Sequence, residues 1–140
     1  MRRAERIKKM QIINAENQTR AAGPEAYFSG KVQVNGLFSM PAPATAAAAI
    51  VTFDPSARTA WHTHPRGQLL FVLSGTGWVQ SKGQPKQTVR AGGTVWFDAN
   101  ELHWHGATNE SSMTHVAIQQ SENGSTVDWA DLVADADYLG

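Results

Sequence analysis

From Phe28 onward, short apolar runs alternate with turn-forming residues, and this pattern limits the fold more than any other feature of the sequence. Turn signals such as Asn35-Gly36, Asp54-Pro55 and Ser74-Gly75 separate candidate strands at 31–34, 45–53, 58–63, 68–73, 76–81, 86–90, 94–97 and 113–119. Regular short strands with frequent Gly, Pro and Asn breaks are typical of an all-β barrel or sandwich. The strand pattern alone does not distinguish a barrel that encloses a site from a sandwich without one.

The two-residue period of a strand assigns the side chains to faces. In the segment 68–73 the even-numbered residues share one face, and the odd-numbered residues, Leu69, Phe71 and Leu73, share the other. Apolar residues on both faces predict that this strand is covered on both sides. By the same period, one face of the strand at 45–53 carries Ala47, Ala49, Val51 and Phe53. One face of the strand at 113–119 carries Met113, His115, Ala117 and Gln119.

Length and composition indicate a single domain without excess charge. With 140 residues the chain is long enough for one domain with its own core and too short for two of ordinary size. The formal net charge of zero argues against nucleic-acid binding, which needs a basic excess. The chain has no cysteine for a disulfide or a thiolate metal site, and no apolar run near the ~20 residues of a membrane span. We therefore expect a cytoplasmic protein that binds neither nucleic acid nor membrane.

The two ends of the chain differ from its middle. Residues 1–26 are polar and lack clean periodicity, so we expect an N-terminal arm that precedes a domain at 27–140. Near the other end, Ser125-Thr126 provides a helix cap before an acidic, amphipathic stretch. This pattern predicts a short C-terminal helix over about 126–138 that covers the barrel.

Four of the five histidines fall in two short segments. His62 and His64 are two residues apart, so both imidazoles leave the same side of a strand. Gln68 follows a Pro-Arg-Gly turn, and His103 and His105 form a second His-x-His pair. A single histidine is more often an ordinary core or surface residue, but two such pairs favour a metal centre. Three histidines and one oxygen ligand, namely His62, His64, His103 and Gln68, suit Mn, Fe, Ni, Co or Zn.

These spacings resemble the two motifs of the cupins. His62-x-His64-x3-Gln68-x6-Gly75 resembles the first motif, with Gln in place of the usual Glu, and Gly92-x5-Asp98-x-Asn100-x2-His103 resembles the second. Asp98 stands where Pro is usual and Asn100 where Gly is usual, but these are turn positions and the ligand positions are intact. The resemblance covers about residues 28–120. It implies an all-β fold, the cupin double-stranded β-helix or jelly-roll barrel, with one metal ion inside.

Longer strings narrow the resemblance. The stretches 58–65, 103–107, 113–119 and 127–129 together resemble the bacterial manganese-dependent cupin hydroxynitrile lyases, which cleave or form (R)-mandelonitrile. The resemblance implies one divalent ion, manganese before the other metals, held by His62, His64, His103 and Gln68. It also implies reversible cleavage of an (R)-cyanohydrin to an aldehyde and HCN, with His105 as the general base that accepts the hydroxyl proton.

A neutral glutamine ligand has an electrostatic consequence. A glutamate at Gln68 would cancel part of the charge of a divalent ion, whereas glutamine leaves that charge in place. The ion would then attract an oxygen or cyanide ligand more strongly, and redox cycling would be less favourable. Both effects favour polarising chemistry over oxygenation.

Further candidate site residues lie on the strand faces assigned above. If those faces line the cavity, His115 would hold substrate or cyanide and Gln119 would shape the far wall. The small residues Ala49 and Val51 would leave room for an aromatic aldehyde. For His115, and less so for His105, an ordinary structural role is the alternative.

Two other functions fit the same ligands. One is a metal-dependent oxygenase of small aromatic or keto substrates, and the other is a non-catalytic cupin that binds a metal or a small molecule. Small cupins commonly pair through strand exchange or sheet packing. The resemblance therefore also implies a homodimer or homotetramer, and the apolar segment 69–73 fits burial in such a contact.

Overall fold

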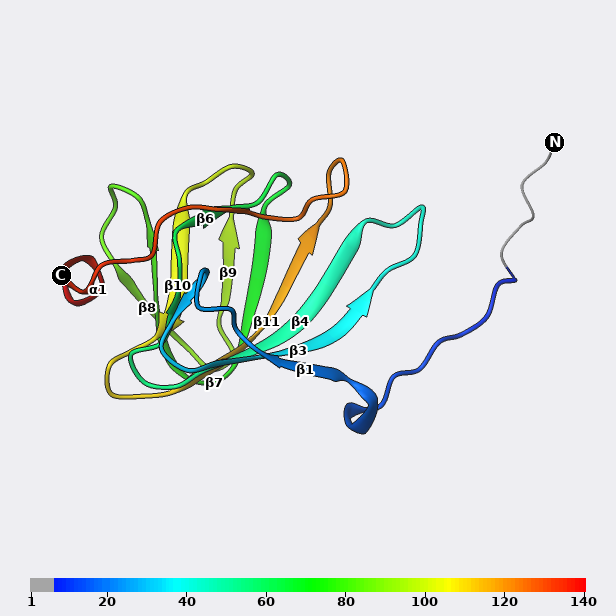
Figure 1. Ribbon diagram of the computed structural model, residues 1–140, viewed down its shortest axis with the longest axis horizontal. Coiled ribbons are helices and arrows are strands. Elements are labelled where there is room, and N and C mark those ends of the chain that lie inside the picture. The colour runs from blue at the N-terminus through cyan, green and yellow to red at the C-terminus, as the bar shows by residue number, and fades with distance from the viewer. Residues whose placement is uncertain (1–6) are drawn as a thin grey trace.

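The computed structural model describes residues 7–140, and its regular secondary structure is almost entirely β-strand, arranged in a curled sheet (Figure 1). The predicted all-β class with a short C-terminal helix is confirmed. In chain order the elements are η1 (Ala15–Asn17), β1 (Thr19–Ala22), β2 (Phe28–Ser29), β3 (Val32–Ser39), β4 (Ala46–Phe53), β5 (Arg58–Thr59), β6 (His62–Thr63), β7 (Gln68–Ser81), β8 (Gln87–Arg90), β9 (Thr94–Phe97), β10 (His103–Ala107), β11 (Met113–Gln120), β12 (Asp128–Trp129) and α1 (Asp135–Leu139).

One long strand connects the two halves of the barrel. The first part of β7 pairs with β9 and β11, and its second part pairs with β8 and β10, all antiparallel. The sequence pattern treats β7 as two strands separated by Ser74-Gly75, and the structure shows one strand of 14 residues through that point. Beyond β7 one layer continues through β11, β4, β3 and β1, and the other through β10, β5 and β2. The curled sheet thereby encloses an interior between the two layers.

Strand register stacks the inward-facing side chains of three strands into rows. Residues that lie opposite each other in an antiparallel pair project to the same side of the sheet. Across β4, β11 and β7 the rows are Val51-His115-Val72, Ala49-Ala117-Leu70 and Ala47-Gln119-Gln68. Apolar rows thus pack beside rows that carry histidine and glutamine, and the interior holds both a core and a polar site.

The C-terminal segment departs from the prediction of a helix over 126–138. The helix is confined to Asp135–Leu139, and Asp128–Trp129 forms β12, which pairs with β6. The backbone also exchanges hydrogen bonds with the barrel, since Ala130 N–H donates to Trp61 O at 2.8 Å and Trp61 N–H donates to Asp131 O at 2.9 Å. Pairing with a strand distant in sequence outweighs the local helical pattern.

The N-terminal range also contains a strand. β1 lies within the stretch assigned to the arm and pairs with β3 at the edge of the sheet. Residues 7–14 run away from the barrel, and Ile7, Met10 and Ile12 are largely exposed (Figure 1). Residues 1–6, the start of the predicted arm, lie outside the described residues. Within residues 7–140, no helix is long and apolar enough to span a membrane.

Two glycines of the turn pattern provide a matched test of the backbone. Gly75 has φ +77°, and a Cβ there would overlap the carbonyl oxygen of Ser112, whereas Gly92 has φ +87° and open space around it. We predict that Gly92→Ala lowers the free energy of unfolding by about 1–2 kcal/mol, which is the backbone strain alone. Gly75→Ala should cost about 4 kcal/mol, because overpacking adds to that strain. Urea denaturation followed by circular dichroism measures both, and equal losses would contradict the described contact.

Candidate active site

Three histidines from different parts of the chain converge inside the barrel. His62 lies on β6, His64 follows that strand, and His103 begins β10 directly opposite His62 in the register. One ring nitrogen of each lies within 4.8 Å of the others, and all three side chains are buried. We call these three residues the His triad. The sequence-predicted ligands are thus brought together by strand pairing across about 40 residues of chain.

Each imidazole of the His triad is oriented by a backbone carbonyl. Nδ1–H donates to that carbonyl, which leaves a lone pair on Nε2. Nε2 of His64 is buried without a hydrogen-bond partner in the described part of the chain. A carbonyl behind the far ring nitrogen is the usual support of a metal-binding histidine. The three pairs are His62–Ala60 at 2.8 Å, His64–Thr126 at 2.7 Å and His103–Glu101 at 2.7 Å.

Gln68 directs its amide oxygen at the same point. The side-chain amide of Gln119 donates to the carbonyl of Ala47 at 3.3 Å, so the Gln119 oxygen accepts from Gln68 Nε2 at 3.2 Å. This relay leaves Gln68 Oε1 facing Nε2 of His103 at 3.3 Å. Both atoms are acceptors, and two buried acceptors repel each other unless a cation lies near both. The donor set of three imidazoles and one amide oxygen therefore fits a divalent metal ion.

Burial keeps the His triad in the form that binds metal. Burial lowers the pKa of His103 to about 4. Burial also lowers the pKa of His62 well below its ordinary value, with repulsion from His103 adding to the effect, and it lowers the pKa of His64. The imidazoles are consequently neutral at pH 7, and neutral imidazole is the metal ligand.

His105 and His115 form a second pair beside the His triad. Nε2 of His115 and Nδ1 of His105 are 3.0 Å apart, so one proton lies between them. Burial lowers the pKa of His115 to about 4, and burial together with repulsion from His115 lowers the pKa of His105 well below its ordinary value. His105 Nε2 is buried without a hydrogen-bond partner within residues 7–140. Nδ1 of His115 also has no partner there, so each neutral ring of the pair keeps one unused nitrogen, and that of His105 is Nε2.

A cavity of about 150 Å³ brings most of these groups onto one surface, with His103 outside its lining. Its polar lining holds His62, His64, Gln68, His105, His115 and Gln119, together with Thr59 and Thr126. Its apolar lining comes from Phe28, Val34, Ala49, Val51, Ala117, Val127 and Trp129. The sequence-predicted residues Ala49, Val51 and Gln119 thus lie at the cavity. A larger hollow of about 370 Å³ between β7, β8 and β9 contains none of the histidines and only apolar, amide and hydroxyl side chains beside Glu101.

Sequence reasoning missed the contribution of the C-terminal segment to this cavity. It assigned Thr126 and Trp129 to a helix, whereas Thr126 orients His64 and the Trp129 ring lies 4.8 Å from the His62 ring. It also missed Thr59, whose hydroxyl accepts from the His105 backbone N–H at 3.2 Å. The stretch 127–129 contributes to the resemblance to known enzymes, but its local sequence pattern does not indicate that these residues reach the site.

The fold and the site define a small jelly-roll barrel with a buried three-histidine centre. The model of the cupin domain matches residues 49–118, and the chain belongs to the cupin family. Over 129 residues it is 46% identical to the (R)-mandelonitrile lyase of Granulicella tundricola, which covers 92% of this chain and 98% of that protein. The predicted similarity to a small single-domain cupin of this type is confirmed.

Solved structures agree on the fold. A cupin-like protein from Thermotoga maritima superposes with a TM-score of 0.80 at 32% identity, covering 84% of this chain and 90% of that chain. The polyketide cyclase RemF from Streptomyces resistomycificus has a TM-score of 0.73 at 14% identity, covering 93% and 91% of the two chains. At that identity the second likeness concerns the fold alone.

Proposed function

We propose that this chain is a metal-dependent hydroxynitrile lyase that reversibly cleaves an (R)-cyanohydrin such as mandelonitrile to an aldehyde and HCN. The observation that carries the proposal is 46% identity over almost the whole length of a protein named (R)-mandelonitrile lyase. The arrangement of the site supports it, since His62, His64, Gln68 and His105 line one small cavity with apolar walls, and a ring nitrogen of His103 lies within 4.8 Å of those of His62 and His64.

The proposed cofactor is one divalent ion, Mn²⁺ in the first place, with Fe, Zn, Ni or Co as alternatives. His62, His64, His103 and Gln68 would hold it, because their unshared electron pairs converge. When bound, the ion supplies a positive charge that stabilises negative charge on the substrate oxygen. No carboxylate belongs to this donor set, so the protein leaves the positive charge of the ion undiminished.

His105 is the proposed general base. To accept a proton on Nε2 it must carry its own proton on Nδ1, and that proton then points to Nε2 of His115 at 3.0 Å. His115 would therefore hold the tautomer and the orientation of the base. The backbone of His105 is held in turn by the Thr59 hydroxyl. The low pKa keeps the ring neutral and able to accept a proton at pH 7.

The bond changes balance without an oxidant or a second substrate. His105 Nε2 takes the proton of the substrate hydroxyl, the carbon–carbon bond to the nitrile breaks, and its electron pair leaves with cyanide. The hydroxyl carbon becomes the aldehyde carbonyl, and the proton passes from His105 to cyanide to give HCN. The apolar wall that includes Ala49, Val51 and Trp129 would take the substituent of the aldehyde.

Replacement of His105 tests the assignment of the base. We predict that His105→Ala binds as much metal as the unmodified protein and releases HCN from racemic mandelonitrile about 10²–10⁴-fold more slowly, which is the usual contribution of a general base. His115→Gln keeps an acceptor for the His105 proton and should lose less. A His105→Ala variant with most of its activity would refute the base assignment. Metal-loaded unmodified protein that releases no HCN would refute the proposed activity itself.

We also propose that a second copy of the chain covers the outer face of β7. On this face Leu69, Phe71, Leu73 and Trp96 are 36–57% exposed, so the predicted cover on both sides of the strand is present on one side only within residues 7–140. The face extends across β9, β7, β11, β4 and β3, where laterally paired residues form two rows without a charged side chain. These rows are Trp96-Leu69-Ile118-Ala48-Phe38 and Thr94-Phe71-Val116-Ile50-Asn35. A contiguous uncharged face of this kind marks a contact between proteins, and symmetric self-association buries it without burying charge.

Light scattering during size-exclusion chromatography tests this contact. We predict that the unmodified chain elutes as a dimer or tetramer and that Phe71→Glu, which places a charge at the centre of the face, elutes as a monomer. Gln87→Glu adds the same charge at an exposed position of β8 and should leave the assembly unchanged. A monomeric unmodified protein, or an unaffected Phe71→Glu assembly, would contradict the proposed face.

A further inference from the structure

We propose that Arg58 is a positioning residue for the metal-binding histidines, and that it acts through the C-terminal strap, which we define as residues 126–139. The proposal rests on the candidate metal centre described under the proposed function. Arg58 does not line the cavity, and its side chain leaves β5 on the side opposite to Thr59, which does. Its influence would therefore pass through the strap.

The strap is bonded to the segment that carries two residues of the His triad. Its Thr126 carbonyl accepts from His64 Nδ1 at 2.7 Å. Its strand β12 places Trp129 opposite His62 in the register, and the next residues exchange two backbone hydrogen bonds with Trp61. The orientation of His64 and the backbone beside His62 thus depend on where the strap lies.

The strap also forms one wall of the cavity. The ring of Trp129 lies 4.8 Å from the ring of His62 and stacks on Tyr27 at 4.7 Å and 11°. Thr126 and Val127 complete the wall. A displaced strap would therefore open the cavity and remove a hydrogen-bond acceptor from His64 in the same movement.

The strap has little regular structure of its own to hold it in place. Residues 130–134 belong to no helix or strand, and α1 has five residues without a side-chain cap at its start in the described chain. Backbone exposed in this way opens easily unless contacts elsewhere hold it. Beyond the pairing of β12 with β6, its position then depends on contacts at its far end.

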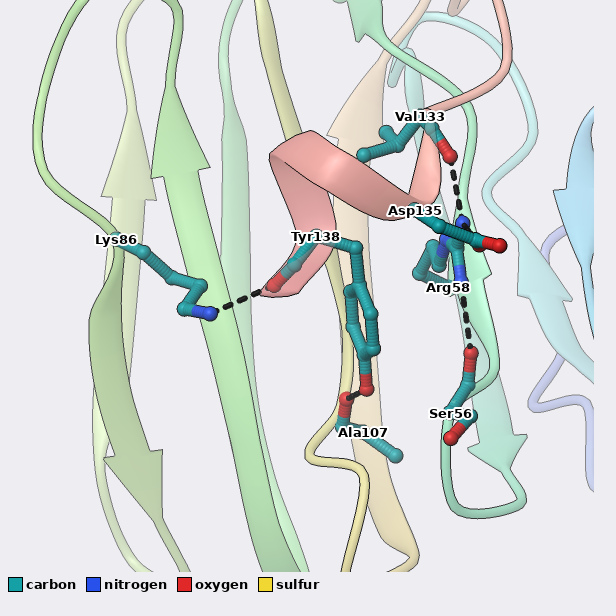
Figure 2. A network of polar contacts seen from close by, with 7 residues as sticks. All are labelled: Ser56, Arg58, Lys86, Ala107, Val133, Asp135 and Tyr138. Atoms are coloured by element: carbon teal, nitrogen blue, oxygen red, sulfur yellow. Dashed lines mark hydrogen bonds and ion pairs between the residues drawn. The ribbon is translucent and has the colours of Figure 1, made fainter. Parts of the chain in front are cut away.

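Arg58 provides two polar contacts at that end, beside Lys86, whose Nζ donates to the carbonyl of Tyr138 at 2.6 Å (Figure 2). Arg58 Nη2 donates to the carbonyl of Val133 at 2.6 Å and to Asp135 Oδ1 at 2.8 Å. Its guanidinium also lies 4.4 Å from the centre of the Tyr138 ring, and the Tyr138 hydroxyl donates to the carbonyl of Ala107 at 2.6 Å. Figure 2 shows these contacts between the helix and the adjacent strands.

The burial of Arg58 makes its separation from the strap unfavourable. Arg58 is only 7% exposed with the strap in place, and displacement of the strap would remove the Val133 carbonyl and the Asp135 carboxylate and leave only the Ser56 carbonyl, which accepts from Nη1 at 3.3 Å. An unpaired buried charge is strongly unfavourable, and the closed strap is favoured for that reason. By contrast, Asp135 is 88% exposed, so its carboxylate alone should matter less than the arginine.

The test is the affinity of the metal-free full-length chain for Mn²⁺, measured by isothermal titration calorimetry at 25 °C. Arg58→Met, which keeps the apolar stem without the donors, should weaken Mn²⁺ binding tenfold or more, as expected when the support of a ligand is lost. Arg58→Lys keeps the charge but cannot bind two acceptors with one planar group. Its Mn²⁺ affinity should lie between those of the unmodified chain and Arg58→Met. Arg90→Met removes an exposed arginine of β8 and should bind within twofold of the unmodified chain.

Thermal denaturation of the metal-free variants separates positioning from stability. If Arg58→Met lowers the melting temperature while its Mn²⁺ affinity stays within twofold, Arg58 is merely structural and the proposal is overturned. If Arg58→Met does not fold, Asp135→Ala serves instead and should weaken Mn²⁺ binding at least threefold, with unchanged affinity again overturning the proposal. An unmodified chain that binds no Mn²⁺ would instead refute the metal centre, and with it any positioning role of Arg58.

Discussion

The whole site depends on three hydrogen bonds in which an imidazole Nδ1–H donates to a backbone carbonyl. The carbonyls belong to Ala60, Glu101 and Thr126, which lie in three separate segments of the chain. Each bond sets both the tautomer and the direction of one ring, and together they aim three Nε2 atoms at one point. Because backbone carbonyls are placed by strand pairing and turns, the geometry of the centre is a direct product of the fold.

The spacing of residues in the sequence predicts which side chains form the site, but not which residues orient them. A two-residue period puts His62 and His64 on one side of a strand, and it puts Gln119 on the same face of β11 as His115. It does not predict that Gln119 orients the amide of Gln68, because that contact joins strands 51 residues apart. The C-terminal segment shows the same limit, since its local pattern favours a helix whereas its backbone pairs with β6. Long-range pairing decides both outcomes, and no local pattern encodes it.

Two opposed requirements meet in the cavity. Burial lowers the pKa of the histidines and keeps them neutral, which a metal ligand and a general base both need. The same burial makes every unpaired hydrogen-bond acceptor unfavourable. Two such acceptors, Nε2 of His103 and Oε1 of Gln68, lie 3.3 Å apart. A divalent ion would resolve this conflict, because it would pair with the converging acceptors without a charged ligand. Apolar residues such as Val51 and Ala117 line the same cavity.

Elemental analysis of the purified protein tests whether the His triad and Gln68 hold one divalent ion. We expect about one equivalent of a divalent transition metal per chain, Mn²⁺ foremost, which a chelator removes and added Mn²⁺ restores. His64→Ala, measured in parallel, should retain far less metal. A folded, unmodified chain that holds no metal even after reconstitution would refute the metal centre, because its buried acceptors would then converge without a cation.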